Sequence, residues 1–261
     1  WYWMPDIFES FYNDFNYHTS DFYQLKRIAP SYKIFWEDDT SSLIPAEYNK
    51  LKKLFEKIEK GSGDKLDKYL DDARIKYEVG MGEFVERPSI SVTEYIDPKL
   101  ITNSFKLDLL KSISSSISKK FENIKLKQIL EFPVLFLGAK PSKTPALYSM
   151  MNYADIKLGT WYPIGGMYEI AKAFTQIAEE QGVNIMLSQP VENITIKNGI
   201  VTEVNTNTDK YEADAVINCA DYHHFEQNIL DKEFRKYDTD YWDSRVFAPT
   251  CLLFYLGVDK G

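Results

Sequence analysis

The stretch GTWYPIGGM, residues 159–167, together with the segment that follows it up to Asp221, decides the fold of this chain. Gly165 and Gly166 follow a proline and place bare backbone where a helix is about to begin. Such a turn either joins a loop to a helix or lets a planar or anionic group approach the helix end closely. An apolar stripe with helical spacing follows, and Gly182 is placed to end that helix.

Beyond Gly182 the pattern becomes extended. Residues 183–187 predict a strand, and residues 193–197 and 200–204 flank Asn198-Gly199, the strongest short hairpin signal in the chain. Residues 211–218 predict another extended stretch. A helix, a strand, a hairpin and a further strand in this order indicate a segment of an α/β domain that carries a small β-meander.

The residues before 159 are mostly helical in pattern. Apolar stripes predict helices over residues 6–15, 45–58 and 66–77, then from Pro98 to Ile113, over 124–130 and over 144–153. A short aromatic strand is expected at residues 32–36, and residues 132–138 form a dense apolar run. The expected fold class is therefore mixed α/β, with a helix-rich first part that contains a mixed sheet.

Bulk properties exclude several classes of function. The 261 residues carry a net charge of −8, which argues against nucleic acid as the main partner, since phosphate binding needs clustered Lys and Arg. No apolar run is long enough to span a membrane, and the longest lies near residues 249–258. Aromatic residues make up 15% of the chain, which fits either an aromatic-rich core or an aromatic-lined ligand pocket.

Cysteine and histidine usage gives no sign of a metal site. Cys219 and Cys251 both lie in apolar runs and are expected to be buried thiols in a reducing compartment. The three histidines show no zinc-binding spacing, so no structural metal is expected.

Six segments resemble the bacterial phytoene desaturases and occur in the same order along nearly the whole chain. They are WYWMPDIF at 1–8, LKR with PSY at 25–32, FPVLFLG at 132–138, TPALYS at 144–149, GTWYPIGGM at 159–167 and ADYHH at 220–224. The layout from the helix after Gly166 to residues 213–221 is similar to the middle of flavoproteins of the amine oxidase and phytoene desaturase superfamily. The chain is therefore identified as an internal part of such an enzyme.

The resemblance implies FAD as cofactor, bound by both ends of a longer protein. It places the flavin next to Trp161, Pro163, Gly165 and Gly166, the adenine on the backbone of Val191, and the run containing Ala220 and Asp221 beneath the FAD. Trp161 is open to a second interpretation as a plain core aromatic. The glycine-rich turn GxGxxG that grips the pyrophosphate is absent from this sequence, which makes FAD binding by residues 1–261 alone doubtful.

The same resemblance divides the chain into most of a substrate-binding domain at residues 1–164, part of an FAD-binding domain at 165–230, and a return to the substrate-binding domain at 231–261. Asp71 and Arg74 lie three residues apart and share a helix face. They are expected either to position the substrate or transfer a proton beside the flavin, or to form an exposed ion pair.

The function implied is FAD-dependent desaturation of a carotenoid precursor such as phytoene. Its partners would be a long apolar polyene and, peripherally, a membrane surface touched by an apolar helix of the first part, with a cytoplasmic location. Carotenoid isomerases, saturases or another flavin oxidoreductase on an apolar substrate are alternatives, as is a non-catalytic module that binds an apolar ligand or a membrane.

Overall fold

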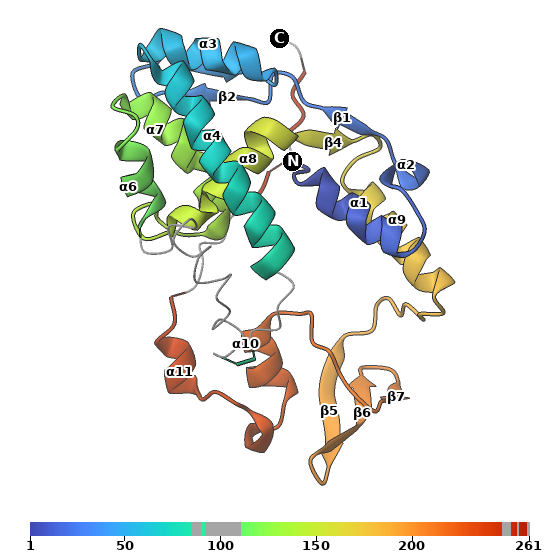
Figure 1. Cartoon of the computed structure of the whole chain (residues 1–261). Coiled ribbons are helices and arrows are strands. Elements are labelled where there is room, and N and C mark those ends of the chain that lie inside the picture. Colours follow the sequence, from blue (N-terminus) through green and yellow to red (C-terminus); the bar gives the residue numbers. More distant parts are fainter. Residues whose placement is uncertain (85–89, 92–110, 247–251, 255, 260–261) are drawn as a thin grey trace. The chain divides into compact units, whose positions relative to one another are not determined.

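The structure, a computed structural model, describes residues 1–84, 90–91, 111–246, 252–254 and 256–259. It divides the chain into two compact units, unit 1 at residues 1–177 and unit 2 at 178–261, which are described separately (Figure 1). The expected domain boundaries at residues 164 and 230 concern a whole flavoenzyme and stay a prediction. The mixed α/β class is confirmed, because helices and small sheets occur together.

Unit 1 is built mainly from helices. Its elements are α1 (Pro5–Asp14), α2 (Thr19–Phe22), β1 (Leu25–Arg27), β2 (Tyr32–Phe35), β3 (Ser41–Ile44), α3 (Tyr48–Ile58), α4 (Ser62–Val79), η1 (Gly80–Phe84), α6 (Ile113–Ser118), α7 (Ile124–Glu131), η3 (Phe132–Leu137), η4 (Ala146–Ser149), α8 (Met150–Tyr153), η5 (Ala154–Leu158), β4 (Trp161–Pro163) and α9 (Tyr168–Glu180), which runs into unit 2. The helices expected at residues 6–15, 45–58, 66–77 and 124–130 are confirmed as α1, α3, α4 and α7.

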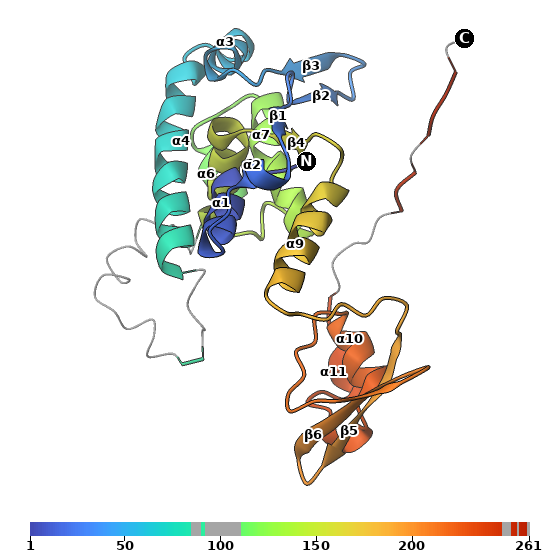
Figure 2. The same ribbon diagram turned by 90° about the vertical axis from the view of Figure 1, so that its right-hand side faces the viewer.

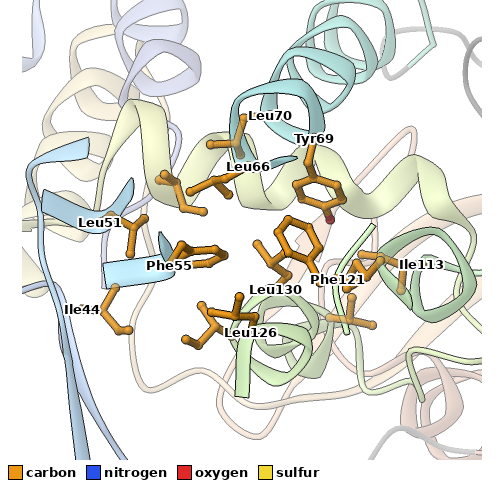
Figure 3. Packing of buried hydrophobic residues seen from close by; sticks show 14 residues of the cluster. Ile44, Leu51, Phe55, Leu66, Tyr69, Leu70, Ile113, Phe121, Leu126 and Leu130 are labelled. Atoms are coloured by element: carbon orange, nitrogen blue, oxygen red, sulfur yellow. The ribbon is translucent and has the colours of Figure 1, made fainter. Parts of the chain in front are cut away.

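The main core of unit 1 lies between α3, α4, α6 and α7 (Figure 2). Phe55, Leu66 and Tyr69 meet Phe121 and Leu130 there, all nearly inaccessible to solvent (Figure 3). Ring centroids of Phe55 and Phe121 lie 6.0 Å apart. Truncating one such side chain to alanine typically costs about 2–5 kcal/mol, so this cluster supplies much of the stability of unit 1.

A second cluster joins α1 to α9. The hydroxyl of Tyr23 lies 2.9 Å from that of Tyr12 and 3.2 Å from that of Tyr2, and all three rings are buried. Ala173 and Ile177 of α9 pack against them. The turn before α9 is thereby tied to the first residues of the chain.

The strand pairs in the described part are antiparallel. β1 pairs with β4 and β2 pairs with β3 in unit 1. The mixed sheet expected for the helix-rich part is therefore not found among the described residues. Each of these pairs is short, and helices rather than sheets carry the core.

Unit 2 contains an antiparallel sheet of order β5-β6-β7 and short helices. Its elements are β5 (Val191–Lys197), β6 (Ile200–Thr206), β7 (Lys210–Glu212), α10 (Tyr222–His224), η6 (Phe225–Ile229), η7 (Lys232–Phe234) and α11 (Thr239–Asp243). The hairpin is confirmed: Asn198 and Gly199 have φ of 54° and 77°, as a type I′ turn requires. Glu226 is buried and accepts hydrogen bonds from Trp242 Nε1, the Tyr222 hydroxyl and the Lys236 N–H.

Two expectations for unit 2 are wrong. Residues 183–187 form no ladder, and their apolar side chains are exposed, because no strand in the described part pairs with them. Cys219 is exposed rather than buried, since the extended segment around it is likewise unpaired. Cys251, most of the helix expected from Pro98 to Ile113 and part of residues 249–258 lie outside the described residues.

None of the helices in the described part combines the length and the hydropathy that a bilayer crossing requires. The described residues also contain no cluster of His, Cys, Asp and Glu that could hold a metal ion.

Candidate functional site

An aromatic cavity of about 870 Å³ opens between β2, α7 and η3 of unit 1. Its volume lies in the range of pockets that bind small organic ligands. The lining is mostly apolar and comprises Trp1, Tyr32, Ile34, Phe35, Trp36, Ile124, Phe132 and Leu135, with Lys33, Glu37, Asp38, Lys125, Gln128, Glu131 and Pro141 around them.

Contacts between rings form one wall of the cavity. Trp1 lies 5.6 Å from Tyr32 and 5.8 Å from Phe132 between ring centroids, and Tyr32 lies 5.4 Å from Phe132. Phe136 closes the cluster, 5.6 Å from Phe132. Such tilted and edge-on contacts are the favoured geometries of aromatic pairs, so the wall is a packed surface rather than a set of loose side chains.

A buried carboxyl group fixes this wall from behind. Asp155, 5% exposed, accepts a hydrogen bond of 3.1 Å from the Tyr32 hydroxyl and one of 2.6 Å from Thr160 Oγ1. Thr160 Oγ1 in turn accepts from Trp3 Nε1 at 2.9 Å. Burial raises the pKa of Asp155, and the two hydroxyl donors and the nearby Arg27 oppose that rise. The network thus links the cavity wall to the residue that precedes β4.

A charged pair lies at one edge of the cavity. Lys125 Nζ lies 2.6 Å from Asp38 Oδ2 and 5.4 Å from the centre of the Trp36 ring. The hydrogen bond from Lys125, aided by Thr40, lowers the pKa of Asp38 to about 2. Asp38 is therefore ionised, and its charge is balanced by the lysine beside it.

The two expected catalytic residues lie elsewhere on unit 1. Asp71 is exposed on α4, and the described lining of the cavity includes neither Asp71 nor Arg74. Arg74 Nη1 donates to both carboxylate oxygens of Glu78, at 2.8 and 2.9 Å, and this bond raises the pKa of Arg74. Asp71 also interacts electrostatically with Arg74, so the two residues do share one region of α4, as their spacing predicts.

Trp161 and Pro163 lie on β4, opposite Arg27 and Leu25 of β1. Trp161 Nε1 donates to the carbonyl of Leu158 at 2.8 Å, and the Arg27 guanidinium lies over the indole at 5.7 Å. The Trp161 side chain is half-buried and Pro163 is buried. Trp161 is thus partly a core aromatic, and a role of its ring beside a flavin stays a prediction.

The glycine turn before α9 has the backbone that its sequence predicts. Gly165 and Gly166 have φ of 99° and 106°, a region that side-chain-bearing residues rarely adopt. A Cβ on Gly165 would come within 2.8 Å of the Glu169 side chain. The chain therefore turns sharply here and presents backbone without side chains at the start of a 13-residue helix.

The other three expected FAD contacts belong to unit 2. Val191 begins β5 with its side chain exposed. The Ala220 N–H donates to Asn218 Oδ1 at 3.1 Å, and Asp221 caps α10 by accepting from the His224 N–H at 2.7 Å. These bonds give Asp221 a structural role, and contact of the three residues with FAD stays a prediction.

The donor set of the chain fits parts of an FAD molecule. An aromatic strand and a bare glycine turn suit the flat flavin, and an exposed strand start suits an adenine held by backbone groups. The pyrophosphate needs a row of N–H donors at a helix end, and the sequence has no GxGxxG turn to supply them. The chain therefore offers groups suited to the flavin and to the adenine, and contact of these residues with FAD stays a prediction.

The chain belongs to the family of flavin-containing amine oxidoreductases, whose model matches residues 12–250. It is also similar to individual carotenoid enzymes. It is 35% identical, over 99% of its length and 52% of the relative, to carotenoid 3,4-desaturase of Haloarcula japonica. It is 26% identical to the zeta-carotene-forming phytoene desaturase of Myxococcus xanthus, over 87% of this chain and 44% of that protein.

A 4,4'-diapophytoene desaturase of Staphylococcus aureus is 25% identical, over 98% of this chain and 52% of the relative. The chain thus spans about half the length of the curated relatives it matches. Among solved structures, a putrescine oxidase redesigned in its cofactor binding is 14% identical to this chain, with a TM-score of 0.49. The match covers 88% of this chain and 48% of that protein. This likeness is too weak to add to the fold assignment.

The Asp155 network and the cavity that it supports were not predicted from the sequence. Tyr32 and Asp155 are 123 residues apart, so no local spacing could connect them. A signal was present in the stretch YADIKLG at residues 153–159, where the carboxylate of Asp155 lies between the apolar residues Ala154 and Ile156. A charged group in such a setting is rarely buried without partners.

Proposed function

We propose that this chain is part of an FAD-dependent enzyme that dehydrogenates a carotenoid precursor such as phytoene. The observation that carries the proposal is the 35% identity to a carotenoid 3,4-desaturase over 99% of the chain. The aromatic cavity of unit 1 supports it, because a polyene offers no charge or hydrogen-bonding group and must be held by apolar burial, worth about 25 cal/mol per Å².

In this proposal Trp1, Tyr32 and Phe132 bind a segment of the polyene along the cavity wall. The Lys125–Asp38 ion pair forms the polar edge of that cavity. An apolar chain gains no binding free energy by extending past this edge. Asp155 holds the Tyr32 ring in place through its hydroxyl and is shielded from the cavity by that ring.

Desaturation removes a hydride from one carbon and a proton from its neighbour, leaving a new double bond. FAD, when bound, accepts the hydride. Trp161, Pro163, Gly165 and Gly166 would flank the flavin, and Val191, Ala220 and Asp221 would contact the rest of the cofactor. Asp71, which is exposed on α4, would receive the proton, and Arg74, which interacts with it electrostatically, would orient it.

The partners proposed with this activity are the polyene and a membrane surface on the cytoplasmic side, touched peripherally. Phytoene-like hydrocarbons partition into bilayers, so an enzyme that takes them up gains from contact with the lipid surface.

A second candidate is a non-catalytic module for apolar ligands. The cavity favours this second candidate, because the cavity lies wholly within unit 1 and could bind an apolar chain without flavin. A polyene that binds to the whole protein without flavin and without product would select this candidate.

The test is the visible absorption spectrum of the purified whole protein that contains this chain, followed by anaerobic incubation with phytoene in lipid. Flavin bands and a product with added conjugated double bonds are expected. A protein that stays free of flavin after reconstitution with FAD would exclude the enzyme. Phe132→Ala should lower turnover on phytoene about tenfold, whereas Phe234→Ala, a half-buried phenylalanine of unit 2, should not.

A further inference from the structure

The short helix η3 presents apolar side chains to solvent. Pro133 and Val134 are buried in the core, whereas Leu135, Phe136 and Leu137 are 63%, 56% and 37% exposed. Three consecutive exposed apolar residues are unusual on a surface that meets only water. Gly138, with a φ of 65°, then turns the chain away.

These residues continue into a larger apolar surface. Leu135 lines the cavity together with Phe35 and Ile124, which are 75% and 62% exposed. The Phe136 ring lies 6.0 Å from Trp1 and 5.0 Å from Trp3. We call this surface the apolar rim and define it as Trp1, Phe35, Ile124, Leu135, Phe136 and Leu137.

The chain around the apolar rim is basic although the whole protein is acidic. Residues 111–144 contain seven lysines and two glutamates, while the full chain has a net charge of −8. Lys33, on β2 beside Phe35, is exposed, as are Lys140 and Lys143 just after η3. Among the acidic residues of the cavity, Asp38 is neutralised by Lys125, and only Glu37 and Glu131 oppose the lysines.

We propose that the apolar rim is the surface by which the protein docks on an anionic lipid bilayer, with the mouth of the aromatic cavity facing the lipid. Exposed Leu and Phe side chains gain free energy in the acyl region, and tryptophan favours the interface. Lysines near an anionic surface add electrostatic attraction to it. The proposal extends the proposed function by naming the surface involved, and a substrate dissolved in lipid would then enter the cavity without crossing water.

The experiment is cosedimentation of the whole protein with vesicles of pure phosphatidylcholine and of phosphatidylcholine mixed with phosphatidylglycerol. The double variant Leu135→Ser with Phe136→Ser should bind the mixed vesicles at least tenfold more weakly. The matched control is Leu187→Ser with Ile217→Ser, which removes two apolar side chains that are 81% and 90% exposed in unit 2. Lys140→Glu with Lys143→Glu should weaken binding to the mixed vesicles and leave binding to pure phosphatidylcholine unchanged.

Equal binding of the wild-type protein and the rim variant would overturn the proposal, as would a wild-type protein that binds neither vesicle because another part of the polypeptide or a partner protein covers the rim. Unchanged melting temperatures separate loss of docking from loss of fold. Failure here is distinguishable from failure of the proposed function, which is measured by flavin content and by turnover of detergent-dispersed phytoene. Vesicle binding without flavin would keep the docking surface and reject the enzyme.

Discussion

The hydroxyl of Tyr32 donates a hydrogen bond of 3.1 Å to Asp155 Oδ2, so a residue of the cavity wall is held by a carboxyl group buried behind it. The bond spans 123 residues of sequence and joins β2 to η5. Because Asp155 also accepts from Thr160, removal of either donor leaves a buried carboxyl oxygen without that partner.

Tyr32→Phe should destabilise the protein by about 1–3 kcal/mol, the usual cost of leaving a buried polar group unpaired. The ring that lines the cavity is kept, so ligand contacts are preserved. Urea unfolding followed by tryptophan fluorescence measures the effect. Tyr168→Phe, at an exposed tyrosine, is the control, and an equal change in both variants would contradict the role of the bond.

Asp155→Asn should change how stability depends on pH. Burial raises the pKa of Asp155 above its value in the unfolded chain, so the folded state binds a proton more readily. The wild-type protein therefore loses stability as pH rises from the ordinary carboxyl pKa through the raised one, and the asparagine variant lacks that loss. The free energy of unfolding of wild type minus variant should fall with rising pH. A difference independent of pH would show that Asp155 titrates normally.

Asp71→Asn and Arg74→Lys test the proposed catalytic pair. In the whole protein each should lower the rate of phytoene turnover on the order of 100-fold, because one change removes the proton acceptor and the other removes the group that orients it, and general-base catalysis contributes at that scale. Flavin content should stay constant. Glu78→Gln breaks the Arg74–Glu78 ion pair and serves as the control. If it lowers turnover as much as the other two, the contribution of Arg74 comes from its ion pair.

Gly165→Ala should impair both stability and flavin content of the whole protein. A φ of 99° is strained for alanine, at a cost of about 1 kcal/mol or more. Gly199→Ala, at a φ of 77° in the hairpin of unit 2, carries a similar strain and has open space around its Cβ. It should cost comparable stability, read by thermal unfolding, and leave flavin content unchanged. Equal flavin loss in both variants would remove the glycine turn from the cofactor site.

Sequence patterns predicted the helices and turns whose formation depends mainly on residues close together in the chain. The stripe of Leu66, Tyr69, Leu70, Ala73 and Tyr77 is the buried face of α4. The Asn198-Gly199 pair set the hairpin, since its backbone alone satisfies the turn.

Features that depend on distant partners were beyond such reasoning. Residues 183–187 have the composition of a strand, but a strand forms only where another pairs with it. The cavity is assembled from Trp1, β2, α7 and η3, four places in the sequence with no shared spacing. For the same reason, the sequence shows η3 only as an apolar run, because the fold decides which of its side chains are buried and which are exposed.

The Arg27 guanidinium rests against the backbone of Gly159, so closely that a Cβ there would come within 2.8 Å of it. The same group donates to the carbonyl of Ala46 at 3.0 Å. A side chain at position 159 would have to displace the Arg27 guanidinium, and it would also strain a backbone whose φ is 95°. Positions 159 and 27 should therefore covary across related sequences. A residue larger than glycine at position 159 should accompany a residue shorter than arginine at position 27.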